Sequence, residues 1–134
     1  MKRRVLVAMS AMYALAGCAA SQPDIDKESV EDFIEVRQLE SVDAIRTTSN
    51  DSWKDLNEYQ IIYTARREEY LVVFSRRCWE LNDTRVTPDQ RWDSNSIRAR
   101  FDTIRGCRID SIYKLSETEA EELEQLGEAP GTRN

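Results

Sequence analysis

Residues 58–78 read EYQIIYTARREEYLVVFSRRC, and this stretch decides the fold. Two runs within it, 58–65 and 69–78, are rich in Tyr, Ile, Val and Phe, which favour β-strands. The charged residues 66–68 lie between the runs and predict a turn. The two runs are therefore expected to pair as an antiparallel hairpin.

The second run carries apolar residues on both of its faces, which is typical of a central strand. One face is expected to hold Tyr70, Val72, Phe74 and Cys78, and the other face Leu71 and Val73. Working outward, residues 107–115 predict a last strand, and residues 43–48 are compatible with either helix or strand.

A further strand is predicted over residues 96–102, where apolar and charged side chains alternate. The expected inward residues are Ile97, Ala99 and Phe101, and the expected outward residues are Arg98, Arg100 and Asp102. Short helices are expected near both ends of the domain. Ser29 is the expected cap of the first helix, and residues 116–119 have the spacing of a capping box that starts the second.

The N-terminal stretch has the marks of a secretion signal. Residues 2–4 are basic, residues 5–14 form an uncharged and mostly apolar stretch, and Leu15-Ala16-Gly17-Cys18 ends it with small residues. An ordinary signal peptide with an incidental cysteine is one alternative. A membrane-spanning helix is another, but the apolar stretch falls short of the roughly twenty residues that a span needs.

The Leu-Ala-Gly-Cys ending resembles the lipobox of bacterial lipoproteins. The resemblance implies that residues 1–17 are removed and that Cys18 is acylated, followed by a tether over residues 18–28. The next residue is Ala19, not the aspartate associated with inner-membrane retention in enteric bacteria. This favours a periplasm-facing position on the outer membrane, held by the lipid anchor.

Charge excludes some partners. Without residues 1–17 the chain has 16 basic and 25 acidic side chains, a formal charge of −9. This argues against nucleic acid as a partner and against simple electrostatic attachment to anionic lipid. Residues 64–108 differ from the rest, with ten arginines against seven acids. An anionic ligand could bind there, and the candidate residues are Arg91, Trp92, Arg98 and Arg100; the alternative is a solvated face balanced by acidic neighbours.

Cysteine chemistry follows from the predicted compartment. With Cys18 lipidated, Cys78 and Cys107 remain where disulfides form and persist. A metal site is the alternative, but two cysteines in a chain without histidine make a poor zinc site, so a disulfide is favoured.

Catalysis has little support in the sequence. The absence of histidine removes the usual general base and the usual metal ligand. Four glycines, at scattered positions, form no phosphate-binding loop, and among 25 acids some close carboxylate pair is inevitable. No catalytic residue, metal or cofactor is therefore expected.

Four motifs carry a second resemblance: residues 70–74 (YLVVF), 78–81 (CWEL), 101–104 (FDTI) and 107–115 (CRIDSIYKL). They resemble a group of small, uncharacterised secreted and lipid-anchored proteins of Gram-negative bacteria, known only as a domain of unknown function. Many members have four mature cysteines. The resemblance implies that this chain kept the Cys78–Cys107 bridge and lost another, and it implies no activity.

The predicted fold is a single α+β domain over residues 29–127, followed by a disordered tail at 128–134. It has a small antiparallel sheet of four or five strands, a short helix near each end and one disulfide. The predicted function is that of a non-catalytic cell-envelope lipoprotein that binds another envelope protein. The alternative is a module whose arginine-rich face binds an anionic envelope ligand, such as lipopolysaccharide phosphate or peptidoglycan carboxylate.

Overall fold

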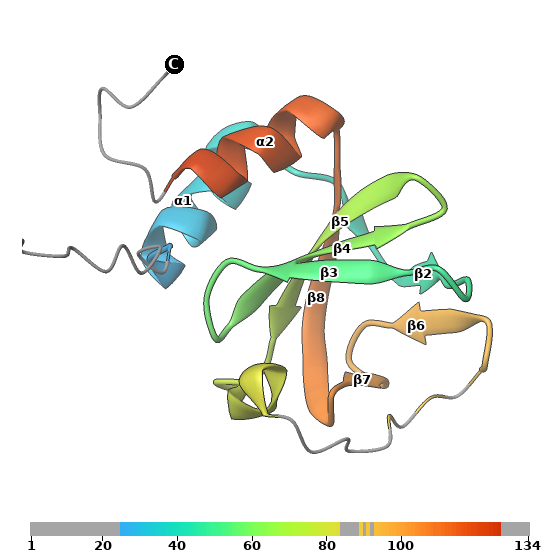
Figure 1. The fold of residues 1–134 in the computed structure, drawn as a ribbon. Coiled ribbons are helices and arrows are strands. Elements are labelled where there is room, and N and C mark those ends of the chain that lie inside the picture. The colour runs from blue at the N-terminus through green and yellow to red at the C-terminus, as the bar shows by residue number, and fades with distance from the viewer. Residues whose placement is uncertain (1–24, 84–88, 90, 92, 127–134) are drawn as a thin grey trace, which may run out of the picture.

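The computed structural model describes residues 25–83, 89, 91 and 93–126, and it has an α+β fold (Figure 1). In chain order the elements are α1 (Lys27–Arg37), β1 (Ser41–Val42), β2 (Ala44–Arg46), β3 (Ser52–Asp55), β4 (Gln60–Ala65), β5 (Glu68–Phe74), the 3-10 helix η1 (Trp79–Asn82), β6 (Ser96–Arg98), β7 (Thr103–Ile104), β8 (Cys107–Leu115) and α2 (Glu117–Gln125). Among these described elements, no helix is both long and apolar enough to cross a membrane.

The main sheet is antiparallel and has the strand order β1-β8-β5-β4-β3, with β7 also paired to β8. The predicted β4–β5 hairpin is confirmed. Its turn is shorter than predicted, because Glu68 already pairs with Ala65 and only Arg66 and Arg67 connect the strands. β5 lies between β4 and β8, so the prediction of a central strand is also confirmed.

The sheet has a hydrophobic core on each face because β5 alternates apolar side chains in both directions. Leu71 packs on the face covered by the two helices, together with Val30 and Leu123. Val72 packs on the opposite face, in a cluster that includes Ile45 of β2 and Ile97 of β6. The small β2–β6 sheet therefore covers the face that the helices leave open.

The predicted strand count was too low, because the main sheet has six strands and β2–β6 forms a separate pair. Most of the additional strands have only two to four residues, too few for a periodic pattern to identify. Helix placement also differs. α1 begins before Ser29, with Asp26 at its N-cap, and Ile25 is already buried, so the folded part starts before the predicted boundary at residue 29.

The predicted strand over residues 96–102 is wrong beyond Arg98. β6 ends at Arg98, and the chain turns so that Phe101 is exposed while Asp102 is buried, the reverse of the expected alternation. The cause is the Asp102 carboxylate, which accepts a hydrogen bond from the backbone N–H of Arg98 at 2.6 Å. The backbone N–H of Asp102 donates to the carbonyl of Arg98 at 3.1 Å and completes the turn.

The predicted disulfide is present and joins the segment after β5 to the first residue of β8. The Cα atoms of Cys78 and Cys107 are 5.8 Å apart, and both residues are fully buried in the core beneath β2–β6. The predicted capping box is also present, with Ser116 and Glu119 exchanging side-chain-to-backbone hydrogen bonds at the start of α2.

Candidate functional site: an arginine-lined hollow

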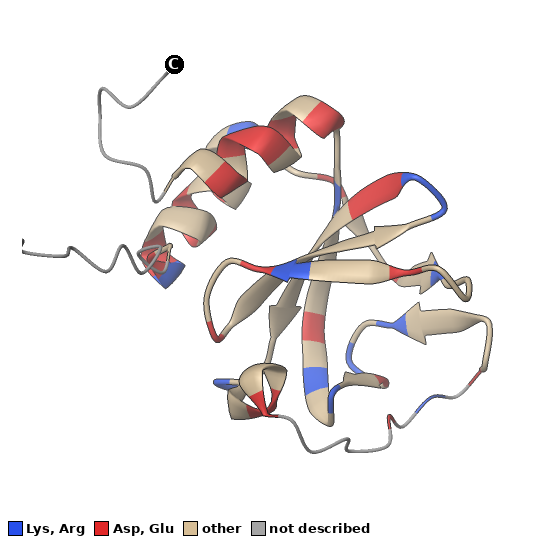
Figure 2. Ribbon diagram, in the orientation of Figure 1, with Lys and Arg blue, Asp and Glu red and all other residues tan. Residues whose placement is uncertain are grey.

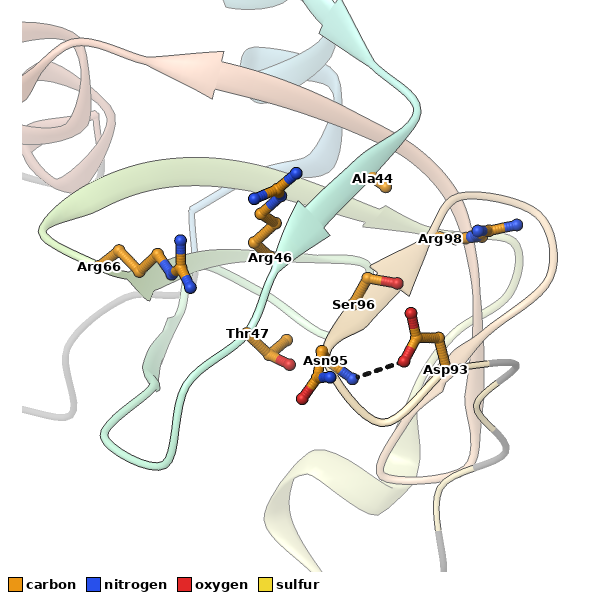
Figure 3. Close-up of a pocket in the computed structure, with 8 residues that line it drawn as sticks. All are labelled: Ala44, Arg46, Thr47, Arg66, Asp93, Asn95, Ser96 and Arg98. Atoms are coloured by element: carbon orange, nitrogen blue, oxygen red, sulfur yellow. Dashed lines mark hydrogen bonds between the residues drawn. The ribbon is translucent and has the colours of Figure 1, made fainter.

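The candidate site is an open hollow of about 640 Å³ beside the β2–β6 sheet (Figure 3). Three arginines distinguish it, and we call it the arginine hollow. Its lining residues are Ala44, Arg46, Thr47, Arg66, Asp93, Asn95, Ser96 and Arg98. Three arginines against one aspartate give this lining a formal charge of +2.

Two of the arginines lie on β2 and β6, where successive side chains point to opposite faces of the two-stranded sheet. Ile45 and Ile97 are register partners, and both point into the core. Their neighbours Arg46 and Arg98 must therefore project from the opposite face. Both arginines are exposed there.

The third arginine comes from the β4–β5 turn. Arg66 and Arg67 connect the strands, and both have left-handed backbone angles, with φ of 53° and 66°. Two-residue hairpin turns of this kind favour Asn-Gly or Asp-Gly, because a left-handed residue with a Cβ atom costs roughly 1 kcal/mol or more. Arginine therefore occupies a position that the backbone does not favour, and Arg66 lines the hollow from it.

The guanidinium groups of the hollow are available to a ligand. Across the described parts of the chain, none of Arg46, Arg66 and Arg98 forms an ion pair within 4.0 Å. The single acid, Asp93, is engaged locally, because its carboxylate accepts a hydrogen bond from the Asn95 N–H at 3.0 Å (Figure 3). The planar guanidinium group of arginine suits carboxylate or phosphate groups.

Replacing the turn with Arg66→Asn and Arg67→Gly is expected to stabilise the fold by about 1 kcal/mol, because the preferred turn residues relieve both left-handed positions. The measurement is the denaturation midpoint of the substituted and native chains. The matched control is Arg66→Lys with Arg67→Lys, which keeps the charges and the Cβ atoms and should change stability little. Equal stability of the two variants would contradict the backbone explanation.

The four predicted ligand-binding residues have different surroundings. Arg98 lines the arginine hollow, and together with Arg100 it also lines a neighbouring hollow, which we call the apolar hollow. The apolar hollow is lined by Asp43, Ala44, Arg98, Ala99, Arg100 and Phe101. Trp92 and the predicted lipidation site Cys18 lie outside the described residues.

Arg91 has partners of its own and does not line either hollow. Its guanidinium lies 3.4 Å from the carboxylate of Asp89, and its positive charge opposes the rise in the pKa of Tyr63. Tyr63 donates a hydrogen bond to Asp51 at 2.9 Å. Burial, together with this bond, raises the pKa of Tyr63. Arg91 thus belongs to a local network that links three segments of the fold.

Sequence reasoning missed Arg46 and Arg66. A strand over residues 43–48 turns Arg46 outward, opposite Ile45, but the sequence of that segment is compatible with either helix or strand. Nothing local connects either residue to Arg98. For Arg46 the connection comes from the β2–β6 pairing, which joins residues 44–46 to residues 96–98. Arg66 instead lines the hollow from the β4–β5 turn.

The disulfide has surroundings that oppose redox chemistry. The Glu80 Oε2 atom lies 3.0 Å from Cys107 Sγ, and hydrogen bonds from Arg76 hold the pKa of Glu80 below its ordinary value. A carboxylate at this distance repels a second negative charge on the Cys107 sulfur and so disfavours a reactive thiolate there. Cys78, Glu80 and Cys107 could offer ligands to a metal ion only if the disulfide were reduced, because metals bind thiolates.

Comparison with known proteins places the chain in a family. Residues 1–129 match the model of a "Family of unknown function (DUF6491)". The chain belongs to this family. The predicted membership of an uncharacterised domain family is thereby confirmed, while the family's description supplies no activity. No curated protein and no solved structure gives a significant match to the chain.

Proposed function

We propose that this member of the family is a non-catalytic lipoprotein of the Gram-negative cell envelope that binds another envelope protein through the arginine hollow. The observation that carries the proposal is that Arg46, Arg66 and Arg98 all line one hollow and form no ion pair among the described residues. Arginine is enriched among residues that dominate binding energy at protein interfaces.

A binding role agrees with the chemistry that the chain carries. The chain has no histidine, and Cys78 and Cys107 are joined as a disulfide. Guanidinium groups bind and orient anions, but they are always protonated and do not act as general bases at neutral pH. The arginine hollow is therefore suited to recognition, and we infer no reaction at it.

The anchor supports an orientation for the hollow. In our proposal a signal peptide is removed and Cys18 is lipidated, which attaches the chain to the outer membrane seven residues before Ile25. An extended chain of that length reaches roughly 25 Å. Ile25 and α1 lie at the helical end of the domain, whereas the β2–β6 sheet lies at the other end (Figure 1). The hollow would thus face away from the anchoring membrane.

The charge of the domain is unevenly distributed. The helices α1 and α2 contain nine acidic and two basic side chains, a net charge of −7, whereas arginines occupy the β4–β5 turn (Figure 2). Electrostatic repulsion between the helices and anionic lipid would by itself turn the helical end away from the membrane. The proposed orientation of the hollow therefore rests on the lipid anchor and not on charge.

A second candidate function is recognition of a single anionic envelope ligand, such as a phosphate of lipopolysaccharide or a carboxylate of peptidoglycan. It is favoured by the positive charge of the site, because three arginines and one aspartate line a single hollow of about 640 Å³. Binding of either partner should weaken as the salt concentration rises.

The test is charge reversal in the full lipidated chain, with Arg46→Glu and Arg98→Glu introduced together. Crosslinking and pull-down from native membranes should then lose the partners that the native chain captures. The melting temperature should change little, because exposed charges contribute little to stability. The matched control is Arg67→Glu with Arg108→Glu, which changes the same charge on exposed arginines outside the hollow.

Two outcomes would contradict the proposal. Unchanged capture by the hollow variant would mean that the arginines are a solvated surface. Equal loss of capture in the hollow and control variants would mean that only the overall charge of the domain matters. Capture of envelope polysaccharide or lipid in place of protein would support the second candidate function.

A further inference from the structure

The apolar hollow adjoins the arginine hollow, and the two share Ala44 and Arg98. It measures about 460 Å³, and its lining includes the apolar side chains of Ala44, Ala99 and Phe101. One arginine side chain thus borders two compartments of different chemistry. A ligand that contacts Arg98 can place an anionic group on one side of it and an apolar group on the other.

Phe101 is the unusual residue of the apolar hollow. Its side chain is 71% exposed, although a phenylalanine gains stability by burial. Large aromatic side chains are typical anchors at protein interfaces, where a partner supplies the missing burial. An exposed phenylalanine next to Arg98 is therefore more typical of a binding site than of a solvated turn.

The backbone beneath Phe101 is held firmly. Arg100, in a left-handed conformation with φ of 70°, donates its N–H to the carbonyl of Ile109 at 2.8 Å. The buried Asp102 closes the turn through its hydrogen bonds with the backbone of Arg98. A ring presented from a fixed turn loses little backbone entropy on binding, which favours affinity.

We infer that the partner segment is an acidic peptide with a large apolar side chain within one or two residues of the acid; this inference rests on the proposed function. The carboxylate binds in the arginine hollow, and the apolar side chain fills the apolar hollow against Phe101. Neighbouring residues of an extended peptide are spaced by about 3.3 Å. Two residues one or two positions apart can therefore occupy two adjacent hollows that both border Arg98.

A peptide fits this surface better than a membrane lipid. The apolar hollow is lined by Ala44, Ala99 and Phe101 together with the charged residues Asp43, Arg98 and Arg100, and its volume of about 460 Å³ admits a large side chain with its backbone. The rim of the arginine hollow offers Thr47, Asn95 and Ser96, whose polar groups can hydrogen-bond a peptide backbone. The surface also lies away from the helical end, where the proposed anchor begins (Figure 1).

The test is selection of random heptapeptides by display on the immobilised full chain in detergent micelles. Four proteins are compared: the native chain, the variant with Arg46→Glu and Arg98→Glu, Phe101→Ser, and Val36→Ser. Val36 is the matched control, because it is 79% exposed and lies on α1 at the other end of the domain. Individual enriched peptides are then measured by fluorescence anisotropy, with phosphatidylglycerol vesicles as a parallel probe.

The native chain and Val36→Ser should enrich peptides in which an acidic residue lies next to a large apolar residue. Phe101→Ser should bind these peptides about tenfold more weakly and keep the acidic preference without the apolar one. The arginine variant should lose the acidic preference. Phe101→Ser should melt at nearly the native temperature, because the ring is already exposed.

Each contrary outcome has a distinct meaning. Acidic peptides enriched without an apolar preference would overturn this inference and leave the proposed function standing. Failure to enrich acidic peptides would overturn both. Vesicle binding that is stronger than peptide binding and is lost in Phe101→Ser would overturn the peptide assignment in favour of lipid.

Discussion

The chain with Cys78→Ala and Cys107→Ala is expected to lose about 2 to 5 kcal/mol of unfolding free energy, a large part of the stability of so small a domain. The two residues are 29 positions apart in the sequence. Closing a loop of that length contributes roughly 3 to 4 kcal/mol in the chain-entropy model. Both side chains are fully buried, so the double substitution also removes packing from the core cluster.

The measurement is urea denaturation of the native and doubly substituted chains, with mass spectrometry of unreduced protein to verify the link between the two cysteine peptides. The native chain under reducing conditions is the matched control and should approach the stability of the variant. Free thiols at both positions in protein isolated from the periplasmic side would contradict the disulfide. Cys78, Glu80 and Cys107 would then be candidate metal ligands.

The parts of the fold that local sequence predicted are those whose cause is local. The β4–β5 hairpin joins neighbouring segments, and its alternation is visible because β5 has a core on each face. The capping box at Ser116 depends only on a residue three positions along the chain. The disulfide was predictable because, with Cys18 predicted to be lipidated, Cys78 and Cys107 were left to pair.

Other parts depended on contacts between segments that are distant in the sequence. β2 and β6 have three residues each, and their pairing brings Arg46 beside the strand of Arg98. A three-residue strand carries too little periodicity to be recognised, and its partner lies about fifty residues away. The arginine hollow could not be assembled without that pairing, although Arg98 itself was singled out.

The segment after Arg98 was mispredicted for a different physical reason. Alternation alone placed Phe101 inward and Asp102 outward. The alternation rule ignores the ability of an aspartate side chain to bond to a nearby backbone N–H. The Asp102 carboxylate makes such a bond to Arg98, so the strand ends in a turn and the two side chains exchange environments. The exposed Phe101 ring that results supplies the large apolar side chain of the apolar hollow.

Replacing Cys18 with serine is expected to abolish lipid labelling and to release nearly all of the protein from the membrane fraction. The reason is that, in the proposed function, acyl chains supply the attachment. Each buried methylene contributes about 0.8 kcal/mol, and more than one chain makes the anchoring stable. Without residues 1–17 the chain carries a formal charge of −9, so anionic lipid would repel it rather than bind it. Labelled palmitate incorporation and membrane fractionation in a Gram-negative host provide the measurement.

Ala19→Asp is the matched control, because it leaves Cys18 in place and changes only the residue that follows. By the resemblance to lipoproteins, this variant should still take up palmitate but should move from the outer to the inner membrane. Lipidation and sorting are then separated by two adjacent substitutions. If the native chain takes up no palmitate, or if Cys18→Ser still fractionates with membranes, the attachment has another origin. The proposed orientation of the arginine hollow would then lose its support, because that orientation depends on an anchor placed just before α1.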